Sequence, residues 1–583
     1  MSSRQKTPKK PKAAKEAEKH ARQLATSTVL KNVSRAAAML LIAGIASPVS
    51  QLNLSPVYGS IPSSLHHQRT MTFTAIGALI GRKGLKRYVS ADLAAYIAVI
   101  SYWAPVIQFL LFPFSTKLGI EHGPLIIESL TYYPLLFLSL YAAADLLDTI
   151  DLSHFNLPAS IGEIVIPTAS YFTVSSIAKL SNASIPNILG TSLYFTRIGF
   201  QMLLASSAAF IAPSRVVLLA FPAILHTLWA NPHHPSSHGF QLANSTLWSN
   251  QNYTLLARQE SITGYVSVLE SHTDNAFRLL RCDHSLLGGE WLVTPEAYKK
   301  GQRQRESIFA VFVLLEAVRL VEPVLKTDIE PLSDSQKSAL VIGLGIGTAP
   351  NAMIAHGINT TIVELDPVVH HYATKYFNLS PNHTAVIDDA VTYVKSKSVT
   401  NPASFEYIIH DVFTGGAEPV FLFTTEFMTG LHALLKDDGV VAINYAGDLS
   451  LGSTRLVLNT IHAIFPACRL FRDSPTSETH APGEPDFINM VVICVKNDHG
   501  LGKEAVKFRS PRPEDFLESI ARHNFLVPKE ELEVEYEYVK ADEGGRVMGR
   551  DDVGELEKYH KEGAVSHWKI MRTVLPDGVW ESW

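Results

Sequence analysis

Charged side chains are scarce over 140 consecutive residues of this chain, and this scarcity most constrains how it can fold. Residues 91–230 contain 11 charged side chains, whereas about 25% of the residues of an average soluble protein are charged. A helix that crosses a membrane needs about 20 largely apolar residues, and several stretches reach or approach that length. They are residues 36–59, 94–115, 125–147, 161–178, 193–213 and 216–230, and a shorter apolar stretch covers residues 71–81.

This succession predicts a multi-pass α-helical membrane domain over residues 36–230, with about 5–7 spans in contact with membrane lipids. The alternative is a set of buried helices in a large soluble protein. Residues 1–35 contain ten Lys and Arg against two Glu, which is typical of a disordered basic tail. Basic residues before a first span favour a cytoplasmic N-terminus.

The three cysteines, Cys282, Cys468 and Cys494, are too few and too scattered for a disulfide framework or a zinc site. We interpret them as buried free thiols in a reducing compartment. Together with the basic tail, they predict an integral membrane protein whose later domain faces the cytoplasm.

The remaining residues divide by composition. Residues 231–252, rich in Pro, His, Ser and Asn, predict a solvated linker without a metal site, and residues 253–300 alternate as expected for a small β-hairpin module. In residues 301–500 the apolar strands SALVIG, TTIVEL, TAVID, FEYIIHD and GVVAINY alternate with helical stretches, which predicts a Rossmann-like parallel sheet. Residues 501–583 form a charged C-terminal extension. The net charge of −5 argues against nucleic acid as a partner.

A nucleoside site is predicted where these strands end. Gly343, Gly345 and Gly347 follow one strand and open a helix, so that the backbone can approach a ligand closely. Glu364 ends the next strand, 21 residues after Gly343, where an acidic side chain can bind the hydroxyls of a ribose. Asp389 follows the third strand and can reach an adenine edge.

The motifs GLGIGT, VELDP, DDA and FEYIIHDVFTGGAEP resemble those of the spermidine/spermine synthase family. The resemblance covers residues from about 260 to 500 and implies a small β module followed by a fold like that of S-adenosylmethionine-dependent methyltransferases. It also implies a donor, either S-adenosylmethionine or its decarboxylated form, and a catalytic role for Asp411. The implied donor-binding residues are Gly343, Gly345, Glu364, Asp389 and Ala390.

Departures from the family pattern favour methyl transfer over aminopropyl transfer. The family carries Asp where this chain has Ile346 and Thr414, and the run SIFAVFVLL replaces its Tyr-His pair. A buried ammonium without a carboxylate is costly, so polyamine binding should be weak. An aminopropyltransferase of polyamine biosynthesis and a non-catalytic polyamine or nucleoside sensor or transporter are the alternatives. Asp411 could also only orient its loop. The acceptor, a small molecule or a protein, stays open, as does the oligomeric state, for which a homodimer is one alternative.

Overall fold

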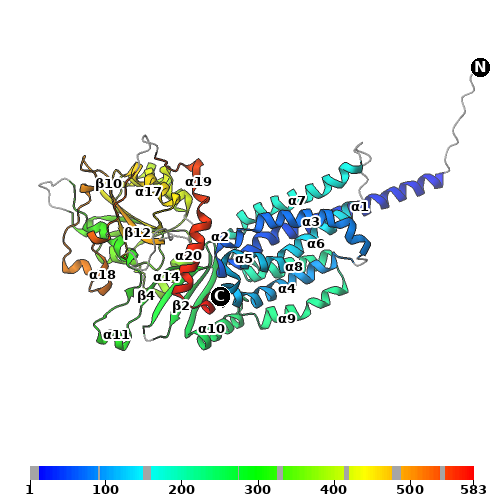
Figure 1. Cartoon of the computed structure of the whole chain (residues 1–583), viewed down its shortest axis with the longest axis horizontal. Coiled ribbons are helices and arrows are strands. Elements are labelled where there is room, and N and C mark those ends of the chain that lie inside the picture. Colours follow the sequence, from blue (N-terminus) through cyan, green and yellow to red (C-terminus); the bar gives the residue numbers. More distant parts are fainter. Residues whose placement is uncertain are drawn as a thin grey trace, which may run out of the picture.

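The structure is a computed structural model with a helical half beside an α/β half (Figure 1). It describes residues 12–88, 92–148, 159–273, 275–324, 332–412, 419–475, 487–538 and 545–583. The helices of the first half are α1 Lys12–Tyr58, α2 Ser60–Ser64, α3 His67–Tyr88, α4 Ala95–Leu111, α5 Ser115–Leu130, α6 Tyr132–Leu147, α7 Ala159–Ser184, α8 Arg197–Ile211, α9 Phe221–Trp229 and α10 Ser237–Gln251.

The prediction of a multi-pass membrane domain is wrong. Within the described residues, two helical stretches are long and apolar enough to cross a membrane, Ser27–Tyr58 and Ala95–Leu130. The helices α6 and α8, with 16 and 15 residues, reach only about 23 Å at 1.5 Å per residue, against about 30 Å of bilayer hydrocarbon. The helices of this half pack on each other, and their largest apolar core includes Met39, Leu136 and Phe200.

Two local features explain why the apolar runs do not become continuous spans. The expected span 125–147 is divided at Thr131, whose backbone is not helical (φ −120°, ψ −74°). The expected span 193–213 begins as a 3-10 turn, and α8 begins only at Arg197, whose buried guanidinium pairs with acids of the other half. A buried charge of this kind belongs to a polar junction, because an unpaired charge in an apolar setting is costly.

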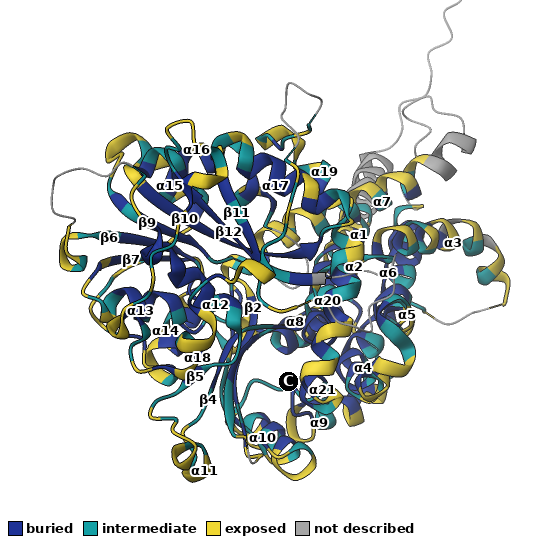
Figure 2. Cartoon of the chain, turned by 60° about the vertical axis from the view of Figure 1, so that its left-hand side comes forward, coloured by how far each residue is buried: buried dark blue, intermediate teal, exposed yellow. Residues whose placement is uncertain are grey.

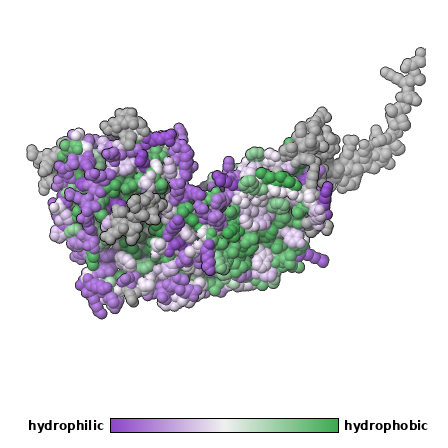
Figure 3. Space-filling view, in the orientation of Figure 1, coloured by the Kyte–Doolittle hydropathy of each residue, from purple (hydrophilic) through white to green (hydrophobic). Residues whose placement is uncertain are grey.

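Apolar side chains also gather on the outside of the helical half (Figure 3). Phe73, Phe172, Phe210 and Trp229 are each more than 60% exposed. Exposed apolar patches of this kind mark surfaces that contact something else. Contact of this surface with membrane lipids stays a prediction.

Helices replace two segments that were expected to be irregular. The helix α1 begins at Lys12, inside the stretch expected to be a disordered tail, because KAAKEAEKHARQLA combines strong helix formers with alternating charge. In the expected linker, Ser236 caps α10 by accepting a hydrogen bond from the backbone N–H of Gly239. His233 is buried and stacks on Trp583 at 4.4 Å between ring centroids, so this segment is packed between the two halves.

The α/β half begins with a five-stranded antiparallel sheet in the order β1-β2-β3-β4-β5. Its strands are β1 Tyr253–Ser261, β2 Gly264–Ser271, β3 Phe277–Cys282, β4 Ser285–Trp291 and β5 Glu306–Ser307. After the short helices α11 Pro295–Lys299 and α12 Ala310–Leu314, the chain enters a seven-stranded sheet in the order β11-β12-β10-β9-β6-β7-β8.

The strands of the larger sheet are β6 Ser338–Ile342, β7 Asn359–Glu364, β8 Thr384–Ile387, β9 Phe405–His410, β10 Leu435–Asp448, β11 Ala467–Arg472 and β12 Phe487–Val495. The first five run parallel, and β12 pairs antiparallel with β10 and β11. The Rossmann-like part of the prediction is confirmed. The strand order reverses between β6 and β9, the point at which such sheets bind ligands.

Helices cover both faces of this sheet, because its strands are apolar on both sides (Figure 2). In β6, Ala339 and Val341 belong to one core, and Leu340 and Ile342 belong to the other. The helices α13 Thr348–Ala355 and α14 Pro367–Tyr376 pack on the first face. The helices α15 Ala390–Thr400, α16 Thr425–Leu434 and α17 Gly452–Ile464 pack on the second.

Buried arginines join the two halves. Arg197 is fully buried, donates to Asp283 Oδ1 at 2.8 Å and to the carbonyl oxygen of Leu52 at 2.7 Å, and has its backbone N–H on Glu260. From the smaller sheet, Arg281 donates to the carbonyl oxygens of Pro56 and Val579.

The C-terminal segment completes this junction. It consists of α18 Ile520–Phe525, α19 Val553–Glu557, α20 His560–Val574 and α21 Asp577–Glu581. In α20, the indole of Trp568 donates to the carbonyl oxygen of Val57 at the end of α1. Residues from three distant parts of the sequence therefore hold the halves together.

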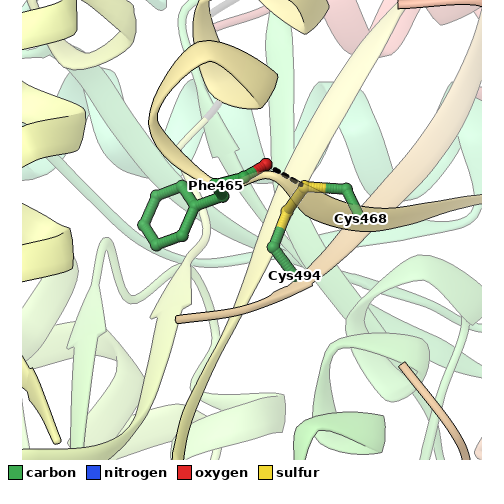
Figure 4. The surroundings of a disulfide bond; sticks show 3 residues. All are labelled: Phe465, Cys468 and Cys494. Atoms are coloured by element: carbon green, nitrogen blue, oxygen red, sulfur yellow. Dashed lines mark hydrogen bonds between the residues drawn. A yellow bond between two sulfur atoms is a disulfide. The ribbon is translucent and has the colours of Figure 1, made fainter. Parts of the chain in front are cut away.

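The cysteines were predicted as free thiols, and for two of them this is wrong. Cys468 and Cys494 face each other in the paired strands β11 and β12 and form a disulfide (Figure 4). Sγ of Cys468 lies 3.2 Å from the carbonyl oxygen of Phe465. A separation of 26 residues hides a pair that the sheet register brings together. Disulfides are typical of oxidising compartments, so the cysteines no longer argue for a cytoplasmic location, which stays a prediction.

Replacing either cysteine of this pair by serine should destabilise the α/β half by about 2–4 kcal/mol, because the cross-link restricts the unfolded chain. Urea unfolding followed by intrinsic fluorescence measures the change. Cys282→Ser is the matched control and should leave the midpoint nearly unchanged, since Cys282 is free. Alkylation of three thiols in the denatured, unreduced protein would show that the disulfide does not form.

Candidate functional site

The glycine loop between β6 and α13 is pressed between two backbones. Gly343 has φ +81°, and a Cβ added there would lie 2.1 Å from the carbonyl oxygen of Asp411. Gly345 has φ +53°, and its Cβ would lie 2.4 Å from the carbonyl oxygen of Leu287 in β4. Only glycine tolerates both the positive φ and the close approach. The loop therefore lies against the end of β9 on one side and the smaller sheet on the other.

The other residues of the loop differ in role. Gly347, with φ +88°, precedes the first residue of α13, so the N-terminal N–H groups of this helix lie next to the loop. Ile346 is buried, and its side chain packs against Gly288 of β4. The family pattern has a carboxylate at this position, and here hydrocarbon fills it.

Glu364 ends β7 beside the glycine loop. Its Oε2 accepts the backbone N–H of Leu344 at 2.9 Å and its Oε1 accepts that of Asp366 at 2.8 Å. Burial raises the pKa of this carboxyl to about 7, although the two backbone hydrogen bonds act in the opposite direction. Each oxygen keeps a further lone pair, so the side chain is fixed and can still accept hydrogen bonds from the two hydroxyls of a ribose.

Asp389 and Ala390 begin α15 after β8. Oδ1 of Asp389 accepts the N–H of Val391, and Oδ2 accepts the N–H and the hydroxyl of Thr392. Asp389 is therefore the N-cap of α15 and is exposed, whereas Ala390 is buried. The adenine contact expected of Asp389 stays a prediction, and the cap fixes its orientation.

Asp411 follows β9 directly, and its backbone N–H donates to the carbonyl oxygen of Ile342 at 2.8 Å. Its Oδ1 accepts a hydrogen bond from Nδ2 of Asn444 at 2.8 Å. Burial raises the pKa of the Asp411 carboxyl to about 6, while the hydrogen bond from Asn444 lowers it. A carboxyl with this pKa can accept a proton near neutral pH.

The structure thus brings the predicted residues together at one edge of the sheet, on both sides of the point where the strand order reverses. Thr414 and the rest of 413–418 lie outside the described residues. Among the residues that the structure describes, no group of three or more His, Cys, Asp and Glu could hold a metal ion.

Sequence reasoning missed two contributors to this site. Asn444 is one: the signal was a lone amide inside the apolar strand GVVAINY. The other is the β4 backbone at Leu287, which closes on the glycine loop and left no signal in the sequence. An adenosyl donor fits the arrangement, because the N–H groups at the start of α13 lie beside the loop and the buried carboxyl of Glu364 can accept the hydroxyls of its ribose.

Comparisons with known proteins found similarity to spermidine synthases. The family described as "Spermine/spermidine synthase domain" matches residues 327–470. A polyamine aminopropyltransferase of Vibrio vulnificus is 35% identical over 109 residues, which are 18% of this chain and 36% of that protein. Among solved structures, a probable spermidine synthase from Corynebacterium glutamicum is 16% identical with a TM-score of 0.35, and the match covers 51% of this chain and 94% of that chain.

A more extensive match includes the helical half. The N-terminal histidine N-methyltransferase of Emericella nidulans is 44% identical over 562 residues, which are 94% of this chain and 97% of that protein. This chain belongs to the same family as that methyltransferase and is an S-adenosylmethionine-dependent methyltransferase with a domain like that of spermidine synthases.

Proposed function

We propose that this protein transfers a methyl group to a nitrogen atom of an N-terminal histidine residue in a polypeptide. The observation that carries this proposal is the 44% identity, over nearly the whole of both chains, to a protein named for that reaction. The site geometry supports a nitrogen acceptor, because Asp411 and Asn444 place oxygen atoms beside the donor loop.

The residues of this chain can carry out the steps that methyl transfer to nitrogen requires. Bound S-adenosylmethionine supplies a methyl group on a positively charged sulfur. The nitrogen lone pair bonds to the methyl carbon as the carbon–sulfur bond breaks, and the acceptor must then lose one proton. Asp411, with a pKa near 6, accepts that proton from an N–H of the acceptor, a contribution worth about 10²–10⁴-fold in rate.

The donor pocket supports ordinary S-adenosylmethionine over its decarboxylated form. Both donors carry an ammonium on the chain attached to sulfur, but only S-adenosylmethionine has a carboxylate beside it that partly balances this charge. The position that carries Asp in spermidine synthases is the buried Ile346 in this protein. Hydrocarbon cannot pair with an ammonium, and burying one without a partner is costly. Glu364 remains available for the ribose, which the two donors share.

The acceptor is tested by incubating the purified protein with S-adenosylmethionine and a short peptide that begins with histidine. We expect one methyl group on the first residue, located by tandem mass spectrometry. The same peptide with alanine before the histidine is the control and should stay unmodified. Methylation of both peptides, or spermidine formation from putrescine and the decarboxylated donor, would contradict the proposal.

Glu364→Ala should weaken donor binding by roughly tenfold or more, because a charge-assisted hydrogen bond contributes about 1.5–3 kcal/mol. Since the pKa of this carboxyl is about 7, its charged form predominates above pH 7, and wild-type affinity should fall as the pH drops below that value. Titration calorimetry at several pH values measures both effects.

Glu406→Gln is the control for this variant. Glu406 also accepts a backbone N–H, that of Ser338, but it lies at the opposite edge of the sheet. The affinity of the Glu406→Gln variant for the donor should equal that of the wild type. Equal affinity in Glu364→Ala would remove Glu364 from the donor site.

Asp411→Asn should keep donor affinity while turnover falls by roughly a hundredfold or more, because the amide keeps the shape and cannot accept the proton. In the wild type, the acid limb of the rate–pH profile should lie near pH 6, with activity lost as the pH falls through the pKa of Asp411. Steady-state rates of methyl transfer measure the turnover and its pH dependence.

Asp437→Asn is the control, because Asp437 is an exposed acid in β10, and this variant should be fully active. If Asp411→Asn were equally active, Asp411 would have a structural role only.

A further inference from the structure

Asn444 lies beside Asp411 and uses only part of its hydrogen-bonding capacity. Its neighbour Ile443 pairs with His410 across β10 and β9, so Asn444 is level with Asp411 at the carboxyl edge of the sheet. Its side chain is 5% exposed. Nδ2 donates to Asp411 Oδ1 at 2.8 Å, and Oδ1 of Asn444 has no hydrogen-bond partner among the residues that the structure describes.

A purely structural role explains this amide poorly. A buried carbonyl without a partner costs about 1–3 kcal/mol, whereas an apolar side chain at this place in an apolar strand would avoid that cost. The strand around it, VVAI before and YA after, is otherwise buried and apolar except for the tyrosine hydroxyl. The free energy lost by leaving the amide oxygen of Asn444 without a partner is therefore not explained by packing.

We propose that Asn444 is a positioning residue of the methyl transfer. Its amide NH₂ holds Oδ1 of Asp411, so that the second carboxylate oxygen is left for the acceptor nitrogen. Its own amide oxygen accepts an N–H of the same acceptor. The reaction class rests on the proposed function, but the Asn444–Asp411 pair is a feature of the structure in either case.

The electrostatics around Asp411 support this role. A hydrogen bond donated to a carboxylate favours the charged form, and Asn444 and burial are the two causes that shift this pKa. The preceding residue, His410, packs its ring on Phe423 and Phe427, and burial lowers the pKa of that ring to about 4, which keeps it neutral. Among the described residues no ionised side chain offsets the burial of Asp411, so Asn444 is what keeps its pKa within reach of neutral pH.

Asn444→Leu and Asn444→Asp test the proposal together. Leucine removes the donated hydrogen bond and keeps the branched shape and the number of side-chain heavy atoms. Aspartate keeps the shape but places two carboxyls around one proton, so that one of the two apparent pKa values of the pair is raised and the other is lowered. In both variants we expect turnover to fall about tenfold to a hundredfold. In Asn444→Leu the acid limb should move up by about one pH unit or more, and in Asn444→Asp it should separate into two steps, the upper of which lies above the wild-type limb. Donor affinity should stay within about twofold of the wild type.

Thr454→Val is the matched control. Thr454 is fully buried next to β10 and donates to the carbonyl oxygen of Asp448, without a contact to Asp411. Thr454→Val loses the buried hydrogen bonds of its hydroxyl, to Asp448 and from Tyr445, so it reports the effect of local destabilisation alone. Its acid limb should coincide with that of the wild type.

Infrared spectra across pH read the protonation of Asp411 directly, without turnover, from a protonated-carboxyl band that Asp411→Asn lacks. An upward shift of this titration in the Asn444 variants supports the proposal even if no histidine peptide is methylated, a result that would contradict only the proposed function. An unshifted titration of Asp411 in Asn444→Leu that is folded and binds the donor would overturn the proposal. If the leucine variant does not fold, an unshifted titration in Asn444→Asp would overturn it instead.

Discussion

The contact between Gly343 and the backbone of Asp411 is the constraint on which the catalytic half depends. At this point β6 and β9 diverge to helices on opposite faces of the sheet, and a side chain on Gly343 would occupy the place of the Asp411 carbonyl oxygen. This close contact between backbones places the glycine loop next to Asp411, although no side chain of the loop bonds to the Asp411 carboxyl. Glu364 is tied to the same loop through the N–H of Leu344. A change in one strand end therefore displaces all three groups.

The site is built around carboxyls that are kept from being fully ionised. Glu364 and Asp411 both have raised pKa values because they are buried, and backbone or amide donors partly offset that burial. This is a general way to obtain a base that works near neutral pH. At Ile346, where the family pattern has a carboxylate, a buried hydrocarbon side chain packs against Gly288.

The parallel sheet and its strand-end residues could be predicted because apolar strands, a glycine loop and acids at strand ends repeat in a fixed order. The partners of these residues could not, since Asn444 reaches Asp411 only through the register of β10 against β9. The same holds for Cys468 and Cys494, which are brought together by an antiparallel pairing. In the helical half, hydropathy alone could not distinguish helices that pack on each other from continuous spans. The breaks at Thr131 and before Arg197 are local backbone features with little effect on composition.

The buried guanidinium of Arg197 has a consequence for any attempt to separate the halves. A fragment that begins at β1 would contain every donor-site residue named above, and its sheet order would be complete. It would also present Asp283 without the cation that pairs with it at 2.8 Å, and Arg281 without the carbonyl oxygen of Pro56. Such a fragment would expose the polar surface around Asp283 and Arg281 to solvent. This surface belongs to the smaller sheet, in which the backbone of Leu287 borders the glycine loop. A cut before β1 therefore leaves charged side chains of the α/β half without their partners, and we expect the two halves to be more stable joined than apart.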